Sequence, residues 1–211
     1  MADRRARRHS TTTPESAIPI QWNTYACLDF VNSEFTDHTG GGIRFDRLPL
    51  PAWQRAFLSH WRWSVRRPAT VRELRQLRRL RSTLRRLLEG AVAVHGLQRN
   101  DVRSIKSKLA AAPFTFALDA DGKVSPVPLV RDWRWIMADL TRSAVEILGD
   151  RDSRRRLKVC ANPDCSWLFY DETLNRSRRW CLSNFCGNLV KVREFRARQR
   201  RASTRTRSGR T

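Results

Sequence analysis

Hydrophobic residues recur at helical spacing between positions 70 and 88, and this is the clearest pattern in the chain. Thr70 and Glu73 form a capping-box signature, in which each side chain can accept a hydrogen bond from the backbone N–H of the other. Arginines fill the other faces, and the apolar positions are Val71, Leu74, Leu77, Leu80, Leu84, Leu87 and Leu88. The spacing predicts an amphipathic helix that buries its leucine face.

Apolar spacing predicts two further helices, at 101–112 and 132–148. Between them, residues 114–118 and 123–130 flank the dipeptide Asp121-Gly122. Alternating apolar residues on either side of such a dipeptide predict a β-hairpin.

The region before position 70 is less regular. Residues 25–32 are almost continuously hydrophobic, and periodicity alone does not decide between strand and helix. Trp53, Phe57 and Trp61 recur every four residues, which predicts a helix with an aromatic inner face. Residues 16–149 are therefore expected to form one α+β domain, mostly helical with a β-hairpin.

Composition divides the whole chain into five segments. Residues 1–15 form a basic leader rich in arginine, serine and threonine, which is typical of disorder. The α+β domain at 16–149 is followed by a charged connector at 150–158. A small cysteine module occupies 159–197, and the basic tail at 198–211 is expected to be disordered.

The chain is strongly basic, with 42 lysine and arginine residues against 20 acidic residues and a formal net charge of +22. Such a field attracts polyanions or anionic membrane surfaces. Only five basic residues are lysine, which indicates codon bias toward arginine, but that bias does not explain the scarcity of acids. No apolar run approaches the roughly 20 residues of a membrane-spanning helix, so nucleic acid is the favoured partner and no membrane association is expected.

The N-terminal residues Met1 to Thr13 contain no apolar core, so they do not resemble a secretory signal. We therefore expect a cytoplasmic protein in a reducing compartment, where disulfides are rare.

Four cysteines form two matched pairs, Cys160-x4-Cys165 and Cys181-x4-Cys186, within 27 residues. Four thiolates at this density suit a closed tetrahedral site for one structural Zn2+. A module of about 40 residues cannot bury enough apolar surface to fold unaided, and metal binding supplies the missing stability. Buried cysteines without metal, or two disulfides, are the alternatives, and the symmetric spacing favours zinc. Cys27 is left over.

Basic residues surround the second cysteine pair. Leu189, Val192 and Phe195 have helical spacing, which predicts a helix packed on the metal module in a treble-clef or ribbon-like arrangement. The expected phosphate contacts are Arg176, Arg178, Arg179, Lys191, Arg193, Arg196 and Arg198. For any one of them a solvated charge is the alternative, but the group around a rigid module favours nucleic acid.

The sequence Cys-Ala-Asn-Pro-Asp-Cys from Cys160, together with Asn-Arg-Ser-Arg-Arg-Trp-Cys and Cys-Gly-Asn further on, resembles the CGNR-type zinc finger of bacterial proteins. Upstream, Cys27-Leu-Asp-Phe-Val-Asn32 is similar to the opening of the ABATE domain, which commonly precedes that finger. The resemblance covers nearly the whole chain. It implies a DNA-binding finger, a larger domain that senses a small-molecule ligand, and a role as a stress-associated transcription regulator.

One residue departs from the family pattern. Leu189 stands where the motif has its arginine. A contact expected from that position must therefore shift to Lys191 or Arg193, or be absent.

Asp29 and Asn32 are polar positions in an apolar run, and they could line a ligand pocket because a buried carboxylate needs a partner. A capping or core hydrogen bond is the other interpretation. No catalytic motif is present, so we expect a non-enzymatic protein. None of the histidines has metal-ligand spacing: His9, His38, His60 and His95.

These observations together predict a nucleoid-associated DNA-binding regulator. The alternatives are a zinc-stabilised RNA-binding or protein-interaction module, and a small-molecule-binding protein that its basic finger localises to the nucleoid.

Overall fold

The computed structural model describes residues 22–38, 41–93 and 99–208. The expected leader at 1–15 lies outside these residues. Within the described part of the chain, no helix is long and apolar enough to cross a membrane. Residues 198–208, expected to be disordered, instead continue the C-terminal helix α7 (Asn188–Ser208).

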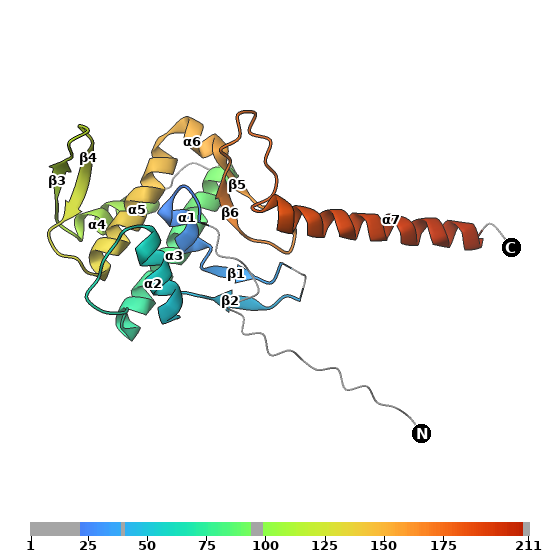
Figure 1. Cartoon of the computed structure of the whole chain (residues 1–211), viewed down its shortest axis with the longest axis horizontal. Coiled ribbons are helices and arrows are strands. Elements are labelled where there is room, and N and C mark those ends of the chain that lie inside the picture. Colours follow the sequence, from blue (N-terminus) through green and yellow to red (C-terminus); the bar gives the residue numbers. More distant parts are fainter. Residues whose placement is uncertain (1–21, 39–40, 94–98, 209–211) are drawn as a thin grey trace, which may run out of the picture.

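Helix α5 (Trp133–Gly149) is the centre of the fold. It packs against α1 (Ala26–Val31), α3 (Val71–Val92) and α4 (Arg99–Ala110). Figure 1 shows these helices as the body of the molecule, with α2 (Pro51–His60) beside them and α7 extending away. The expected α+β class is confirmed, because the N-terminal region is mainly helical and the strands pair in short antiparallel hairpins.

The capping box predicted for α3 is present. Glu73 N–H donates to Thr70 Oγ1 at 3.3 Å, and Thr70 N–H donates to Glu73 Oε2 at 2.8 Å. Val71 lies before the core begins and is exposed. The buried face consists of Leu77, Leu80, Leu84, Leu87 and Leu88, together with the guanidinium-bearing Arg81.

Residues 25–32, whose conformation periodicity left open, form the buried helix α1. The aromatic helix α2 buries Trp53 and Phe57 but ends at His60. Trp61 is its C-cap and Arg62 adopts a left-handed backbone conformation with φ of 54°. The helix therefore ends one residue before Trp61, the last aromatic residue of the predicted pattern.

The strands form three antiparallel pairs within the described residues. The predicted hairpin is β3 (Phe114–Leu118) with β4 (Val124–Pro128), which projects from one end of the body in Figure 1. The others are β1 (Glu34–Thr36) with β2 (Arg44–Asp46), and β5 (Leu157–Val159) with β6 (Leu168–Tyr170). Every residue of β3 is exposed, so this hairpin contributes little to the core.

The charged stretch at 150–158 is folded. It forms α6 (Arg151–Arg156), capped by Asp150, and then strand β5. Leu157 of β5 and Leu168 of β6 are both buried in the same apolar cluster as α1, α3 and α5. The cysteine module and the helical region consequently share one hydrophobic core.

Two polar side chains also join the module to the helices. Asn32 Nδ2 donates to the Leu168 carbonyl at 2.7 Å, and the Leu168 N–H donates to Asn32 Oδ1 at 3.0 Å. Arg85 of α3 donates to the carbonyls of Val31 at 2.7 Å and Ser166 at 2.8 Å. Both side chains satisfy buried or half-buried backbone groups where the two parts meet.

We expect Asn32→Ala to lower the free energy of unfolding by about 2–4 kcal/mol, because it leaves a buried N–H and a buried carbonyl of Leu168 unpaired. Urea unfolding followed by circular dichroism measures the change. Asn100→Ala, at an exposed position of α4, is the matched control and should change stability by less than about 0.5 kcal/mol. Equal effects of the two substitutions would contradict the assignment.

Candidate metal centre and nucleic-acid interface

The four paired cysteines converge at one point, and none forms a disulfide. The Sγ of Cys181 lies 3.7 Å from that of Cys165 and 3.5 Å from that of Cys186. The Sγ of Cys160 accepts the Cys181 N–H at 3.4 Å, and its thiol interacts with the other three. All four side chains are buried, and Cys186 lies in the π-helical turn η1 (Ser183–Gly187) that leads into α7.

These separations fit a tetrahedral zinc ion. Four sulfurs at about 2.3 Å from zinc lie about 3.8 Å from one another. Hydrogen bonds with the neighbouring thiols, that of Cys165 first, lower the pKa of Cys160 to about 7, whereas the pKa values of Cys165 and Cys181 are raised, first by their hydrogen bonds with Cys160. The thiolate is the form that binds metal, so zinc binding must release the protons that the other thiols hold.

A fifth donor comes from the helical region. His38, in the segment between β1 and β2, places its Nδ1 3.3 Å from the Sγ of Cys186. It is only 1% exposed, and its ring lies edge-on to Trp167 and Phe185. One donor atom from each of His38, Cys165, Cys181 and Cys186 lies within 4.8 Å of the others.

Sequence reasoning passed over His38, because it lies 148 positions before Cys186 and no spacing rule connects them. His38 lies in the loop of the β1–β2 hairpin, and the buried Arg81 of α3 holds this hairpin in place. Arg81 pairs with Asp46 at 2.6 Å and Glu34 at 3.2 Å, one residue on each strand.

Arg193, expected to contact phosphate, instead ties α7 to the metal loop. It forms an ion pair with Asp164 and donates to His38 O at 3.3 Å. Asn162, fully buried, donates to the same carbonyl at 3.3 Å and contacts the Cys186 sulfur at 3.7 Å. Arg193 therefore fixes the direction of α7 relative to the cysteine cluster.

Arg178 and Arg176 are also engaged within the protein. Arg178 donates to the carbonyls of Trp180, at 3.0 Å, and Cys181, and its guanidinium lies 4.8 Å from the centre of the Phe169 ring. Arg176 has a left-handed backbone, with φ of 53°, and pairs with Asp152 at 3.2 Å. Both residues shape the loop before the second cysteine pair.

Arg179 has a different position. It is exposed, with its guanidinium 5.1 Å from the centre of the Trp180 ring. Trp180 in turn covers Gly187, where an added Cβ would lie 3.0 Å from a ring carbon. Glycine after Cys186 thus allows the indole to lie flat against the turn and to support Arg179.

Beyond its first turns, the apolar side chains of α7 are exposed. Leu189 is half-buried, but Val192 and Phe195 are 45% and 54% exposed, so the expected packing of all three on the module is wrong. The physical reason is the direction of α7, which extends away from the cysteine module (Figure 1). Exposed along it are Lys191, Arg196, Arg198 and Arg201, none of which has an ion pair with a described residue.

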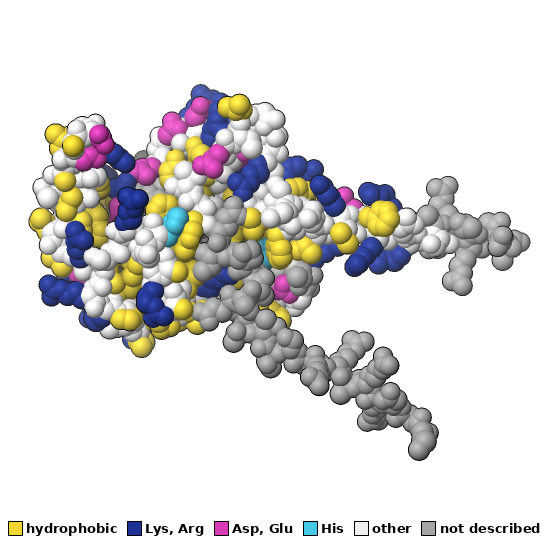
Figure 2. Space-filling model, in the orientation of Figure 1, with side chains coloured by type: hydrophobic (Ala, Val, Ile, Leu, Met, Phe, Trp, Pro, Cys, Tyr) yellow, Lys and Arg dark blue, Asp and Glu magenta, His cyan; other side chains and the backbone are white. Residues whose placement is uncertain are grey.

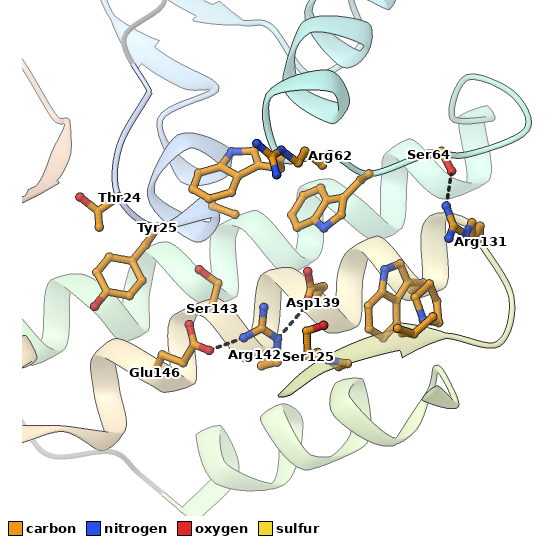
Figure 3. Close-up of a pocket in the computed structure, with 17 residues that line it drawn as sticks. Thr24, Tyr25, Arg62, Ser64, Ser125, Arg131, Asp139, Arg142, Ser143 and Glu146 are labelled. Carbon is orange, nitrogen blue, oxygen red and sulfur yellow. Dashed lines mark hydrogen bonds and ion pairs between the residues drawn. The ribbon is translucent and has the colours of Figure 1, made fainter. Parts of the chain in front are cut away.

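Asp29 and Asn32 are both buried, and neither is among the residues that line the cavity drawn in Figure 3. Asn32 bonds Leu168, as described above. Asp29 accepts hydrogen bonds from the backbone and side chain of Asn23, at 2.8 and 2.7 Å, and from Trp61 Nε1 at 3.1 Å. Of the two interpretations, the structure supports core hydrogen bonding; Asp29 touches the cavity only through Trp61, which is one of its walls.

The four-cysteine cluster, in a module that shares a core with the helical region, places the chain in the class of zinc-finger proteins. Comparison with protein-family models agrees with this class: residues 156–199 match the CGNR zinc finger, and residues 25–151 match ABATE, described as "putative stress-induced transcription regulator". The second match spans more than half of the chain, and the chain belongs to the ABATE family. A search of curated proteins gave no match.

The finger match and the clustered donors together identify one structural zinc. We predict that Cys160, Cys165, Cys181 and Cys186 are its ligands and that His38 donates a hydrogen bond to the Cys186 thiolate. Such donors outside the ligand set orient a ligand and tune its affinity for the metal.

We expect Cys181→Ser to lose zinc and to destabilise the entire chain, because Leu157 and Leu168 carry the finger into the main core. Cys160→Ser should also lose zinc, whereas His38→Gln should keep one equivalent with affinity lowered about 10–100-fold. Metal analysis and competition with a chromophoric chelator measure both quantities.

Cys27→Ala is the matched control, since Cys27 is buried in the core away from the cluster and should leave zinc content unchanged. A full equivalent of zinc in Cys160→Ser, combined with its loss in His38→Gln, would make the imidazole the fourth ligand.

A pH dependence follows from Asp29. Burial raises its pKa to about 7, although the hydrogen bonds from Asn23 and Trp61 lower it. The unfolded chain releases this proton near pH 4, so between about pH 4 and 7 only the folded protein holds it. The free energy of unfolding should therefore fall as pH rises through this window, by at most about 1.4 kcal/mol per unit.

Urea unfolding at a series of pH values measures this slope in the wild type and in Asp29→Asn, which has no titrating group at the position. The difference in stability between the two proteins should change steadily from pH 4.5 to 6.5 and level off above 7. A difference independent of pH would show that Asp29 is ionised throughout.

Proposed function

We propose that the protein is a non-enzymatic transcription regulator of the bacterial cytoplasm, where it associates with the nucleoid. In this proposal α7 and the rim of the zinc finger bind duplex DNA, and the helical region senses a small ligand. The family description supports the regulatory role. The observation that carries DNA binding is the exposed, basic and projecting helix α7.

Helix α7 has a suitable length and position for a DNA groove. Its 21 residues span about 31 Å at about 1.5 Å per residue. Figure 1 shows it clear of the body along most of this length. A single helix of this diameter fits the major groove of B-DNA.

The charges on α7 suit a surface with phosphates on both sides. Lys191 and Arg198, seven residues apart, lie on one side of the helix, and Arg196 lies on the opposite side. Figure 2 shows dark blue basic side chains around the projecting helix. Glu194 is its only acidic residue. Two phosphate ridges border a helix in the major groove, so charges on both sides can be used.

Arg179 extends this surface to the finger, because Trp180 holds it next to the start of α7. With Arg193 occupied by Asp164, Lys191 is the residue that can supply the contact that Leu189 lacks. Four of the seven basic residues predicted from sequence thus remain available to phosphate: Arg179, Lys191, Arg196 and Arg198.

We expect wild-type protein to bind duplex DNA with a slope of log K against log salt of roughly −4, since four phosphate contacts each contribute about −0.9. Arg196→Ala and Arg198→Ala should each weaken binding and make the slope shallower by about one, without changing stability. Fluorescence anisotropy across a salt series measures both.

Two further variants make the test selective. Arg75→Ala removes one equally exposed helical arginine from α3 and should leave the slope unchanged. Arg193→Ala should lower the melting temperature and zinc affinity, because it breaks the tie between α7 and the metal loop. A flat salt dependence, or an equal loss in Arg75→Ala, would refute the interface. Displacement of the DNA by a lower concentration of structured RNA would favour the RNA-binding alternative.

A further inference from the structure

The helical region contains an open cavity of about 430 Å³. None of the residues that line it belongs to the cysteine cluster. Pockets for small ligands in proteins have volumes of about 300–1,000 Å³. Figure 3 shows Arg62 and Ser64, from the segment after α2, on one side of it. Asp139, Arg142 and Glu146 lie along α5 on the other side.

The backbone at Arg62 is the first unusual feature of this cavity. The N–H of Arg62 donates to Ser59 O at 3.1 Å, and that of Trp63 donates to Leu58 O at 2.8 Å. These two bonds form the Schellman motif, in which the residue at the left-handed position is usually glycine. An arginine there, with φ of 54°, is strained, and such strain is often retained for what the side chain does.

Within the described residues, no contact of the Arg62 side chain accounts for an arginine at this position. The side chain is exposed, and its guanidinium forms no hydrogen bond or ion pair with any residue that the structure describes. It lines the cavity between two tryptophans, Trp61 and Trp63. At position 62 the sequence thus has a cation at the edge of the cavity, where the backbone conformation favours glycine.

The charges that line the cavity leave a place for one anion. Arg142 is already paired with both Asp139, at 2.6 Å, and Glu146. Among the residues that the structure describes, Arg131 has one polar partner, the neutral Ser64 hydroxyl at 3.2 Å. The Asp139–Arg142–Glu146 group has a net charge of −1. Arg62 and Arg131 together carry +2 on the other side, so the lining as a whole has a net charge of +1.

The walls of the cavity are flat and aromatic. Trp61 and Trp63 have ring centres 6.2 Å apart, and the buried Trp135 contributes a third indole. The hydrogen bond from Trp61 Nε1 to Asp29 fixes the orientation of the first indole. Two prolines of β4, Pro126 and Pro128, complete the apolar wall. Such surfaces stack with planar rings.

We propose that this cavity binds a planar aromatic monocarboxylate, with the ring among the tryptophans and the carboxylate on Arg62. The guanidinium offers two parallel N–H groups in the geometry that a carboxylate accepts. Arg131 adds positive potential, and the Asp139–Arg142–Glu146 group lines the other side of the cavity. This proposal rests on the sensor role proposed above and names the class of ligand.

The test uses the full chain without DNA, so its outcome does not depend on DNA binding. Isothermal titration calorimetry with naphthalene-2-carboxylate, in roughly 0.3 M salt to screen the overall positive field, measures affinity. Naphthalene-2-carboxamide, of the same shape and without charge, is the matched ligand. The carboxylate should bind wild type at least about tenfold more tightly than the carboxamide does.

Arg62→Gly separates function from folding, because glycine relieves the left-handed strain. This variant should melt about 2–4 °C higher than wild type, because glycine adopts the left-handed conformation without strain. It should bind the carboxylate at least about tenfold more weakly, with no change for the carboxamide. Arg55→Ala, an exposed arginine of α2 outside the cavity, is the control for the loss of one charge.

The proposal is wrong if Arg62→Gly binds the carboxylate as well as wild type does. It is also wrong if Arg55→Ala loses as much affinity, or if the carboxylate binds wild type no better than the carboxamide. In each case DNA binding by α7 would be unaffected, which keeps the two proposals distinguishable.

Discussion

The rest of the structure depends on four buried sulfur atoms brought within contact distance. Four thiolates at this separation repel one another unless a cation lies between them, and a zinc ion supplies that cation. Zinc binding contributes about 10–16 kcal/mol in small fingers, and a whole domain is stable by only about 5–15 kcal/mol. Because Leu157 and Leu168 carry the finger into the main core, that free energy stabilises the helical region as well.

The arginines of the chain are of two kinds: those that hold loops of the fold, and those that are exposed. Arg85, Arg178 and Arg193 donate to backbone carbonyls and hold loops in place. Carbonyls are neutral, so Arg178 keeps its charge while it holds the loop, whereas Arg85 is also paired with Glu89 at 3.1 Å. The high positive charge therefore has two sources: the arginines that hold loops add to the long-range field that attracts polyanions, and residues such as Arg196 remain exposed at the surface.

Sequence patterns predicted those features that depend on local spacing. The capping box at Thr70, the leucine face of α3 and the turn of the β3–β4 hairpin were correct, because neighbours in the chain determine each of them. The cysteine spacing likewise indicated the metal site. His38 was missed because its contact with Cys186 is tertiary.

The same limit applies to individual roles. Sequence patterns predicted the same role for Arg193 and Arg196. Arg193 has a structural role because Asp164 lies within reach of its guanidinium, whereas Arg196 is exposed. Asn32 could have lined a pocket or bonded the core, and the choice depends on the distant Leu168. Phe195 was expected to be buried, but it is exposed. Periodicity shows which residues share one face of a helix, but it does not show whether another part of the protein covers that face.

Two contacts connect the wall of the cavity with the finger. Thr24 and Tyr25 line the cavity, and both contact the segment around β6. Thr24 Oγ1 donates to Glu172 at 2.5 Å, and the Tyr25 ring packs edge-on to Tyr170 at 4.9 Å. From β6 the chain leads through the cysteine cluster into α7. A ligand that moves Thr24 and Tyr25 would thus act on the scaffold that orients α7. In the proposed function, the factor by which this ligand changes the affinity for DNA is, by thermodynamic linkage, also the factor by which DNA changes the affinity for the ligand.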